Sequence, residues 1–372
     1  QVVPLDDPAR AAVFRADPDA ALRRVDEPVL LDEWQVVPEV LGAVKRAVDH
    51  DPQPGRFLLA GSVRAELEQQ LWPATGRAVR LRMHGLTERE VRGHALSGPG
   101  FIDKLAAGDL DAFRVPAAMP DLPGYVELAV RGTFPQPALH LGSDEDRRLW
   151  FDSYLEQLLG RDAVSIQPRR DPVRLRRYFE ALAASTAGTP ADATIYDAVR
   201  VNAKTAAAYE SLLESLHVYE TVPAYSHNRL KRLARLRKRY LLDPALVSSA
   251  LQVTVDGILE DVDLLGRVFD TFAAAQLRPE VALDRRPLQM FHVRDKNGRR
   301  EVDLLIDLGR RGVVGLEFKA TAAPGPRDAA HLAWLRDELG SRFLAGGVLH
   351  SGPGVYELGD RLHALPLCVL WS

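Results

Sequence analysis

The apolar residues of the first part of the chain alternate between strand-like and helix-like spacing. Val29–Leu31 is a short, wholly apolar run, which is typical of a strand buried in a parallel sheet. Behind Pro38, the apolar residues of positions 40–48 recur at helical spacing, and Phe57–Ala60 is a second apolar run. Strand, helix and strand within about 30 residues predict a βαβ unit with parallel strands. Ala78–Met83 is a further candidate strand.

The later pattern predicts more helix and then a second α/β region. Residues 92–145 are rich in Gly, Pro and Ala, which favours a connector with short helices. Between 192 and 214 the spacing predicts a helix-turn-helix whose second helix is capped by Asn202. A helix near Leu264–Leu277 then precedes three strand-like segments, a helix and a last β stretch. We therefore expect an α/β multidomain protein with domains at 1–91, 92–145, 146–243 and 244–372.

Composition and charge exclude several classes of protein. Lys and Arg number 48 against 51 Asp and Glu, so the net charge of −3 excludes a chain adapted over its whole surface to a polyanion, but not a local basic patch. The single cysteine, Cys368, excludes a disulfide framework and a multi-cysteine zinc module. No apolar run approaches the roughly 20 residues that span a bilayer, and no signal peptide opens the chain. We expect a cytoplasmic protein without a membrane partner.

An acidic pair follows the first apolar strand. Asp32 and Glu33 come directly after Val29–Leu31, at the strand end where doubly wound sheets bind ligands. This is the Walker B pattern, in which the Asp holds Mg²⁺ and the Glu activates the attacking water. Ser62 ends the next strand at the same edge. The alternative is that two exposed acids merely follow a strand. No G-x-x-x-x-G-K-[ST] loop occurs in these residues, so we expect no ordinary P-loop binding of ATP by this chain alone.

These segments resemble a family of bacterial AAA-like P-loop ATPases with a restriction-endonuclease-like C-terminal half of unassigned function. The resemblance rests on PVLLDEWQVVPEVLGAVKRAVD (28–49), PGRFLLAGS (54–62) and shorter segments at 5–10, 76–90 and 131–139. It implies that the phosphate-binding loop lies upstream of Gln1, that ATP is bound only by the full-length protein, and that Ser62 senses the terminal phosphate. Related proteins often form rings, so a homo-oligomer is also implied. Trp34 departs from the aliphatic residue usual there.

A second chemical feature is a predicted hairpin near the C-terminus. Residues 301–307 and 313–319 alternate, which places Asp303 on one face of the first strand and Glu317 and Lys319 on one face of the second. A loop over Gly309–Arg311 would set Asp303 opposite Glu317, with Cβ atoms about 4.5–5.5 Å apart. Two carboxylates there repel unless a cation lies between them, which predicts Mg²⁺ or Mn²⁺ with Lys319 beside it.

This spacing, Asp-x₁₃-Glu-x-Lys, is the PD-(D/E)XK nuclease signature. The segments 291–307 and 313–321 again resemble the C-terminal half of the same ATPase family. The resemblance implies that Asp270, on the preceding helix, completes the metal site, although the family usually has Glu there. The alternatives are a solvated hairpin face and a decayed nuclease fold kept as a structural module.

A basic strip lies between the two predicted α/β regions. Seven of eleven residues are basic: Arg229, Lys231, Arg232, Arg235, Arg237, Lys238 and Arg239. Such a strip suits phosphate contacts, and the alternative is the solvated face of an amphipathic helix. Lys204 and Thr205 would be the exposed N-terminal groups of the second helix of a winged helix-turn-helix, with Tyr209 on its buried side. DNA and a protein partner are both open as its ligand.

Three functions follow, from different classes. The first is an AAA-like ATPase coupled to a metal-dependent, nuclease-like domain acting on DNA. The second is a non-catalytic regulator that binds nucleic acid or a partner on an inactivated nuclease fold. The third is the toxic component of a toxin–antitoxin or defence pair, with a cognate antitoxin as its partner.

Overall fold

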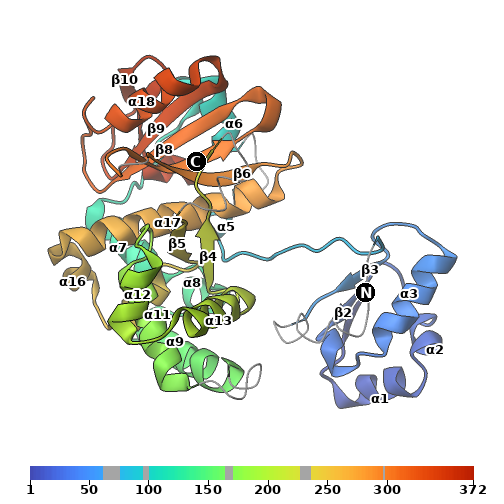
Figure 1. Ribbon diagram of the computed structural model, residues 1–372. Coiled ribbons are helices and arrows are strands. Elements are labelled where there is room, and N and C mark those ends of the chain that lie inside the picture. The colour runs from blue at the N-terminus through green and yellow to red at the C-terminus, as the bar shows by residue number, and fades with distance from the viewer. Residues whose placement is uncertain (62–75, 95–99, 164–170, 227–235, 296–297) are drawn as a thin grey trace. The chain divides into compact units, whose positions relative to one another are not determined.

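The computed structural model describes residues 1–61, 76–94, 100–163, 171–226, 236–295 and 298–372 (Figure 1). It contains two compact units, an N-terminal unit over Gln1–Arg82 and a C-terminal unit over Met83–Ser372. In the described part of the chain, none of the helices has the length and apolar character needed to cross a membrane. The predicted division of residues 83–372 into three domains stays a prediction.

The N-terminal unit is a three-stranded parallel sheet with helices, in the order β1-β2-β3. Val3 pairs with Leu31, which in turn pairs with Leu59, so the predicted βαβ unit is confirmed. Leu31 is fully buried among apolar side chains of α1 and α3, which explains why an unbroken apolar run forms this central strand. The elements are β1 (Val2–Pro4), α1 (Pro8–Ala16), α2 (Pro18–Leu22), β2 (Val29–Asp32), η1 (Trp34–Val36), α3 (Val40–His50) and β3 (Phe57–Leu59).

The strand predicted at Ala78–Met83 is wrong. These residues have no regular secondary structure, and the side chains of Val79, Leu81 and Met83 are 87%, 76% and 94% exposed. Alternation of apolar and basic residues favours an extended chain, but a strand also needs a neighbour for its backbone hydrogen bonds.

The first part of the C-terminal unit is mainly helical, as predicted. The helix-turn-helix is present, and the Asn202 side chain accepts a hydrogen bond from the Thr205 backbone N–H at 2.9 Å, which confirms the cap. A two-stranded antiparallel sheet of β4 and β5 follows it. The elements are α5 (Glu88–Val91), α6 (Phe101–Ala107), η3 (Leu110–Ala112), α7 (Leu122–Arg131), α8 (Pro135–Leu139), α9 (Asp144–Glu156), η4 (Gln157–Asp162), α11 (Pro172–Ala184), α12 (Asp192–Val199), α13 (Ala203–Ser215), β4 (Tyr219–Val222), β5 (Lys238–Leu241), α15 (Ala245–Leu251) and α16 (Val255–Glu260).

The rest of the C-terminal unit is a six-stranded mixed sheet, in the order β10-β11-β9-β8-β7-β6, with helices on both faces (Figure 1). A Cβ atom added at Gly315 would meet Leu332 and Leu335 of α18, whereas one at Gly347 would meet Leu105 of α6. The helix, three strands, helix and final β stretch predicted here are confirmed. The elements are α17 (Val262–Leu283), β6 (Gln289–Arg294), β7 (Glu301–Asp307), η5 (Gly309–Arg311), β8 (Val313–Lys319), α18 (Ala330–Leu339), η6 (Gly340–Arg342), β9 (Phe343–His350), β10 (Tyr356–Gly359), β11 (Leu362–Pro366) and η7 (Leu367–Trp371).

Candidate functional site

The hairpin of β7 and β8 has the register that the sequence predicts. Leu304 pairs with Leu316 and Ile306 with Val314, and the connecting loop is η5. One more step along the same antiparallel register sets Asp303 against Glu317, with Lys319 one same-face position further on. We call Asp270, Asp303 and Glu317 the acidic centre.

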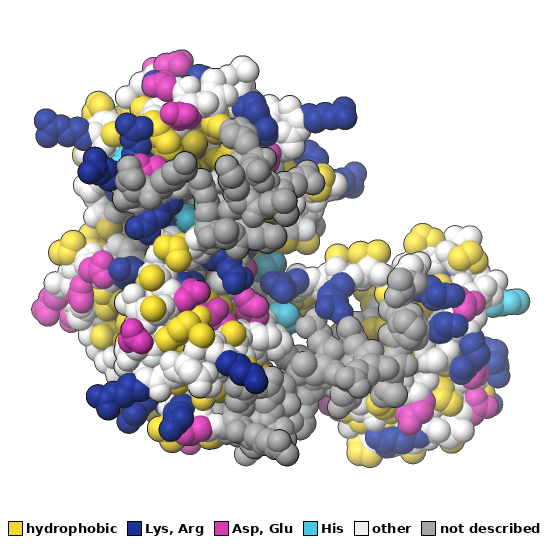
Figure 2. Space-filling view, in the orientation of Figure 1, with side chains coloured by type: hydrophobic (Ala, Val, Ile, Leu, Met, Phe, Trp, Pro, Cys, Tyr) yellow, Lys and Arg dark blue, Asp and Glu magenta, His cyan; other side chains and the backbone are white. Residues whose placement is uncertain are grey.

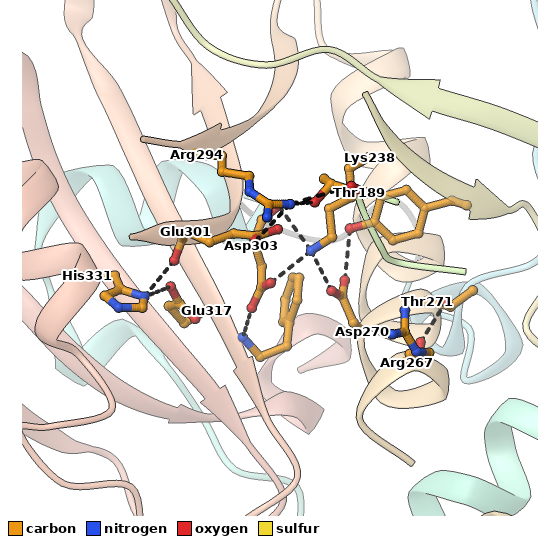
Figure 3. A network of polar contacts seen from close by, with 12 residues as sticks. Thr189, Lys238, Arg267, Asp270, Thr271, Arg294, Glu301, Asp303, Glu317 and His331 are labelled. Atoms are coloured by element: carbon orange, nitrogen blue, oxygen red, sulfur yellow. Dashed lines mark hydrogen bonds and ion pairs between the residues drawn. The ribbon is translucent and has the colours of Figure 1, made fainter. Parts of the chain in front are cut away.

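Lys238, from β5, lies between two of these carboxylates. Its Nζ is 2.6 Å from Asp270 Oδ2 and 2.8 Å from Asp303 Oδ1, and the residue is only 1% exposed (Figure 3). The prediction that Lys238 belongs to an exposed phosphate-binding strip is therefore wrong. Burial removes the ammonium from water, and the two carboxylates replace its hydration.

The remaining oxygen atoms of these two carboxylates are also hydrogen-bonded. Asp270 Oδ1 accepts from the Tyr240 hydroxyl at 2.9 Å, and Asp303 Oδ2 accepts from the Phe318 backbone N–H at 3.0 Å. All four oxygens of the pair therefore have a donor. Such full satisfaction stabilises buried charges that would otherwise be costly.

Glu317 is held less completely. Its Oε2 atom is 3.2 Å from Lys319 Nζ, whereas its Oε1 atom is buried and accepts no hydrogen bond from the described residues. His331 of α18 has its Nδ1 atom 3.9 Å from this oxygen and 2.8 Å from the Glu301 backbone oxygen (Figure 3). One carboxylate oxygen of Glu317, Oε1, is thus buried and has no hydrogen bond from the described residues; we call it the open oxygen of Glu317.

Burial and charge shift the protonation of the centre in opposite directions. Burial raises the pKa of Asp270 to about 7, although the Lys238 ammonium acts against it. Burial and the charge of Asp303 hold the pKa of Glu317 well above its usual range. Burial opposes ionisation of Asp303 too, but Lys238 outweighs it and lowers the pKa of that carboxyl. The Lys238 ammonium therefore favours the ionised form of Asp303, whereas burial and the charge of Asp303 favour the neutral form of Glu317.

A metal ion does not fit this arrangement. Among the described residues, no three His, Cys, Asp or Glu side chains are placed to hold a cation together. Both oxygens of Asp303 are engaged, and the space between Asp303 and Asp270 contains the Lys238 ammonium. The Lys238 ammonium thus lies where the sequence predicts Mg²⁺ or Mn²⁺ bound by Asp270, Asp303 and Glu317.

A pocket of about 840 Å³ opens beside the centre. Asp270, Asp303 and Lys319 line it, together with two arginines that the sequence did not single out, Arg267 and Arg294. Both arginines already have partners: Arg267 Nε is 2.8 Å from Asp263 Oδ2, and Arg294 donates to Thr189 Oγ1. The lining mixes both signs of charge, so it has no strong preference for an anion.

The predicted basic strip is only partly exposed. Arg239 is buried, where it donates to Asp192 of α12 and to the Pro190 backbone oxygen, so its assignment to phosphate binding is also wrong. Arg237 and Lys204 are exposed as expected. Arg229, Lys231, Arg232 and Arg235 lie outside the described residues. On the face in Figure 2, Lys and Arg side chains are interspersed with Asp and Glu.

The acidic pair of the N-terminal unit lies where β2 ends. Asp32 is half-buried, and its Oδ1 atom accepts from the Glu33 backbone N–H at 3.2 Å. Glu33 has a left-handed backbone with φ of 51°, and its carboxylate accepts from the Gln35 side-chain amide. A non-glycine residue in this region stores strain, which is common at functional sites. Ser62 lies outside the described residues.

Comparison with known families divides the chain into three regions. Residues 1–92 match an AAA domain, which confirms the N-terminal half of the resemblance. Residues 122–256 match one domain of unknown function (DUF8612), and residues 265–370 match another (DUF4143). These matches assign no activity to the acidic centre, so its nuclease-like character stays a proposal.

The chain is also similar to two bacterial proteins along most of its length. These are the uncharacterized protein Rv2008c of Mycobacterium tuberculosis and the uncharacterized protein Mb2031c of Mycobacterium bovis. Each is 26% identical over 353 residues, which cover 94% of this chain and 71% of the relative. The chain thus has an AAA domain at its N-terminus, followed by two regions of unassigned function.

Proposed function

We propose that this chain belongs to an ATP-hydrolysing protein whose C-terminal unit is a non-catalytic regulator, built on a nuclease-like fold, that binds DNA. The AAA match and the strained Glu33 at the end of β2 support the ATPase part. In that role Asp32 would hold the Mg²⁺ of bound ATP, and Glu33 would orient the attacking water.

One observation carries the non-catalytic part of the proposal: the Lys238 ammonium between Asp270 and Asp303. Nuclease chemistry at this hairpin needs carboxylate oxygens that are free to bind a cation, and here a buried lysine already neutralises them. Lys204 and Arg237 are both cationic and exposed, so we assign to them the contacts with DNA phosphates.

Plasmid and linear DNA, incubated with the chain and Mg²⁺ or Mn²⁺, test this part. We expect no cutting by the wild type, Asp303→Asn or Lys319→Ala, and a mobility shift of DNA that weakens about tenfold in Lys204→Ala/Arg237→Ala. Loss of two phosphate contacts also lowers the salt dependence of binding. Binding that is unchanged in this double variant would contradict the DNA-contact assignment.

A metal-dependent nuclease is the second candidate, and the open oxygen of Glu317 favours it. Asp303, Glu317 and Lys319 lie on one face of a hairpin beside a pocket, which is the arrangement that the nuclease signature requires. Cutting by the wild type that disappears in Asp303→Asn would establish this candidate and overturn the non-catalytic role. Toxicity, an antitoxin partner and self-assembly stay predictions.

The ATPase part is tested in the full-length protein. Glu33→Gln should lower the ATP hydrolysis rate by at least about 100-fold, the usual scale for losing a general base. Glu39→Gln is the matched control, because Glu39 is exposed and its side chain makes no capping hydrogen bond at α3. Equal hydrolysis by both variants would contradict the role of Glu33.

A further inference from the structure

The space between the carboxylates of Asp270 and Asp303 suits a positive charge, and the ammonium of Lys238 occupies it. Lys238 is buried to 99% on β5, and its Nζ is 3.5 Å from the Asp303 backbone oxygen in addition to the two carboxylates. The three oxygens approach Nζ from α17 and β7, so two separate elements converge on one positive charge.

The same oxygens suit a divalent cation. Mg²⁺ and Mn²⁺ prefer carboxylate and carbonyl oxygens, and the ammonium is already surrounded by that kind of ligand. The buried Glu317 Oε1 atom, which has no hydrogen bond within the described residues, is an additional unsatisfied acceptor across the hairpin from Asp303. The Lys238 ammonium occupies the position that a metal ion bound to Asp270 and Asp303 would take.

We propose that Lys238 is a built-in cation that keeps divalent metal ions out of the acidic centre, and that neutralising it unmasks a site for one Mn²⁺ or Mg²⁺ held by Asp270 and Asp303. The inference rests on the proposed function in one respect, since it explains why the C-terminal unit does not cut DNA. It concerns cation binding alone and involves no nucleic acid.

Lys238 has the geometry of a substitute for a metal. A tethered ammonium is always present at its site, whereas a dissolved cation must displace it and also lose its own hydration shell. Arg239, the next residue on the same strand, is equally buried but pairs with Asp192 and lies 3.5 Å from Glu210. It therefore gives a matched control for removing a buried charge from β5 without touching the acidic centre.

Mn²⁺ binding to the chain, measured by calorimetry and by the electron paramagnetic resonance of free Mn²⁺, tests the proposal. The variants are Lys238→Met, Lys238→Gln, Arg239→Met, Asp303→Asn and Lys238→Met/Asp303→Asn. We expect one bound Mn²⁺ in both Lys238 variants, at least tenfold tighter than any binding by the wild type or Arg239→Met, and its loss in the double variant. Lys238→Gln keeps a hydrogen-bond donor, so a folded uncharged variant is available if Lys238→Met does not fold.

The proposal is overturned if a folded Lys238 variant binds no Mn²⁺. It is also overturned if the wild type binds Mn²⁺ as tightly as Lys238→Met and loses it in Asp303→Asn, or if Arg239→Met gains the same site. These results leave the proposed function untouched, because that function is tested by DNA cutting, by the dependence of DNA binding on Lys204 and Arg237, and by the ATP hydrolysis of Glu33→Gln.

Discussion

The two acidic groups of this protein look alike in the sequence and differ in the structure. Asp32 and Glu33 are bonded to their near neighbours along the chain and are half-buried. Asp303, in contrast, is neutralised by a lysine 65 residues away, inside the C-terminal unit. A carboxylate with local partners stays available to a ligand, whereas one paired with a distant buried lysine is already part of the packing.

The largest effect expected from this comparison is on stability. Lys238→Met leaves the buried Asp270 and the half-buried Asp303 without their cation, and breaking such a buried ion pair costs about 3–5 kcal/mol. Lys319→Met should cost less than Lys238→Met, because the Lys319 side chain is 37% exposed and only its partner Glu317 is buried. Urea unfolding of the C-terminal unit without metal measures both, and similar losses in the two variants would contradict the distinction.

The second effect concerns pH. Because burial raises the pKa of Asp270 to about 7, the folded state holds this proton between about pH 4 and 7 while the unfolded state releases it. The free energy of unfolding therefore falls as pH rises through this window, by at most about 1.4 kcal/mol per pH unit.

Asp270→Asn should reduce this slope, and the part that comes from Glu317, whose pKa is also raised, should remain. Asp303 behaves oppositely: its pKa is lowered, so its contribution is complete above its ordinary value and is lost only in stronger acid. Asp303→Asn should reduce the slope between pH 5 and 7 only in part, because burial raises the pKa of Asp270 more than the charge of Asp303 does. Urea unfolding at several pH values distinguishes the two variants, and equal slopes in them would refute the assignment to Asp270.

A smaller effect is expected in the N-terminal unit. Glu33 has a left-handed backbone, which costs a non-glycine residue about 1 kcal/mol. Glu33→Gly should raise the free energy of unfolding of this unit by about that amount, whereas Glu33→Ala removes the same carboxylate and keeps the strain. If the two variants are equally stable, the backbone at this position is not strained.

The smallest effect is expected at Asp32. Asp32→Asn keeps an oxygen for the Glu33 backbone N–H and removes a charge that has no ion-pair partner among the described residues, so stability should change by less than about 0.5 kcal/mol. A loss above about 2 kcal/mol, measured in the same way, would place Asp32 in the same class as Asp303.

Features that depend on residues close together in the sequence could be predicted, whereas contacts between residues far apart in the sequence could not. Alternation and loop length define the register that sets Asp303 against Glu317, and a side-chain cap such as Asn202 acts over three residues. The strand predicted at Ala78–Met83 is wrong because the alternation of apolar and polar residues carries no information about a partner strand.

The prediction that Lys238 lies on an exposed strip is wrong for a related reason. Its partners lie 32 and 65 residues away on other elements, and a run of basic residues gives no sign that one of them is buried. The one available signal was the apolar stretch Tyr240–Leu242 directly after the end of the basic strip at Arg239, which is unusual for a solvated strip. Most of the fold was therefore predictable, whereas the charge balance of the acidic centre was not.

The two neighbouring basic residues Lys238 and Arg239 also favour the observed register of β5 over a shifted one. Tyr240 pairs with Glu220 and Arg239 with Thr221, which sends the ammonium of Lys238 to the acidic centre and the guanidinium of Arg239 to α12 and α13. A slip of one residue would send each charge to the wrong face. Asp270 and Asp303 would then lose Lys238, and Asp192 would lose Arg239. A shifted β5 is therefore destabilised by the loss of both groups of ion pairs.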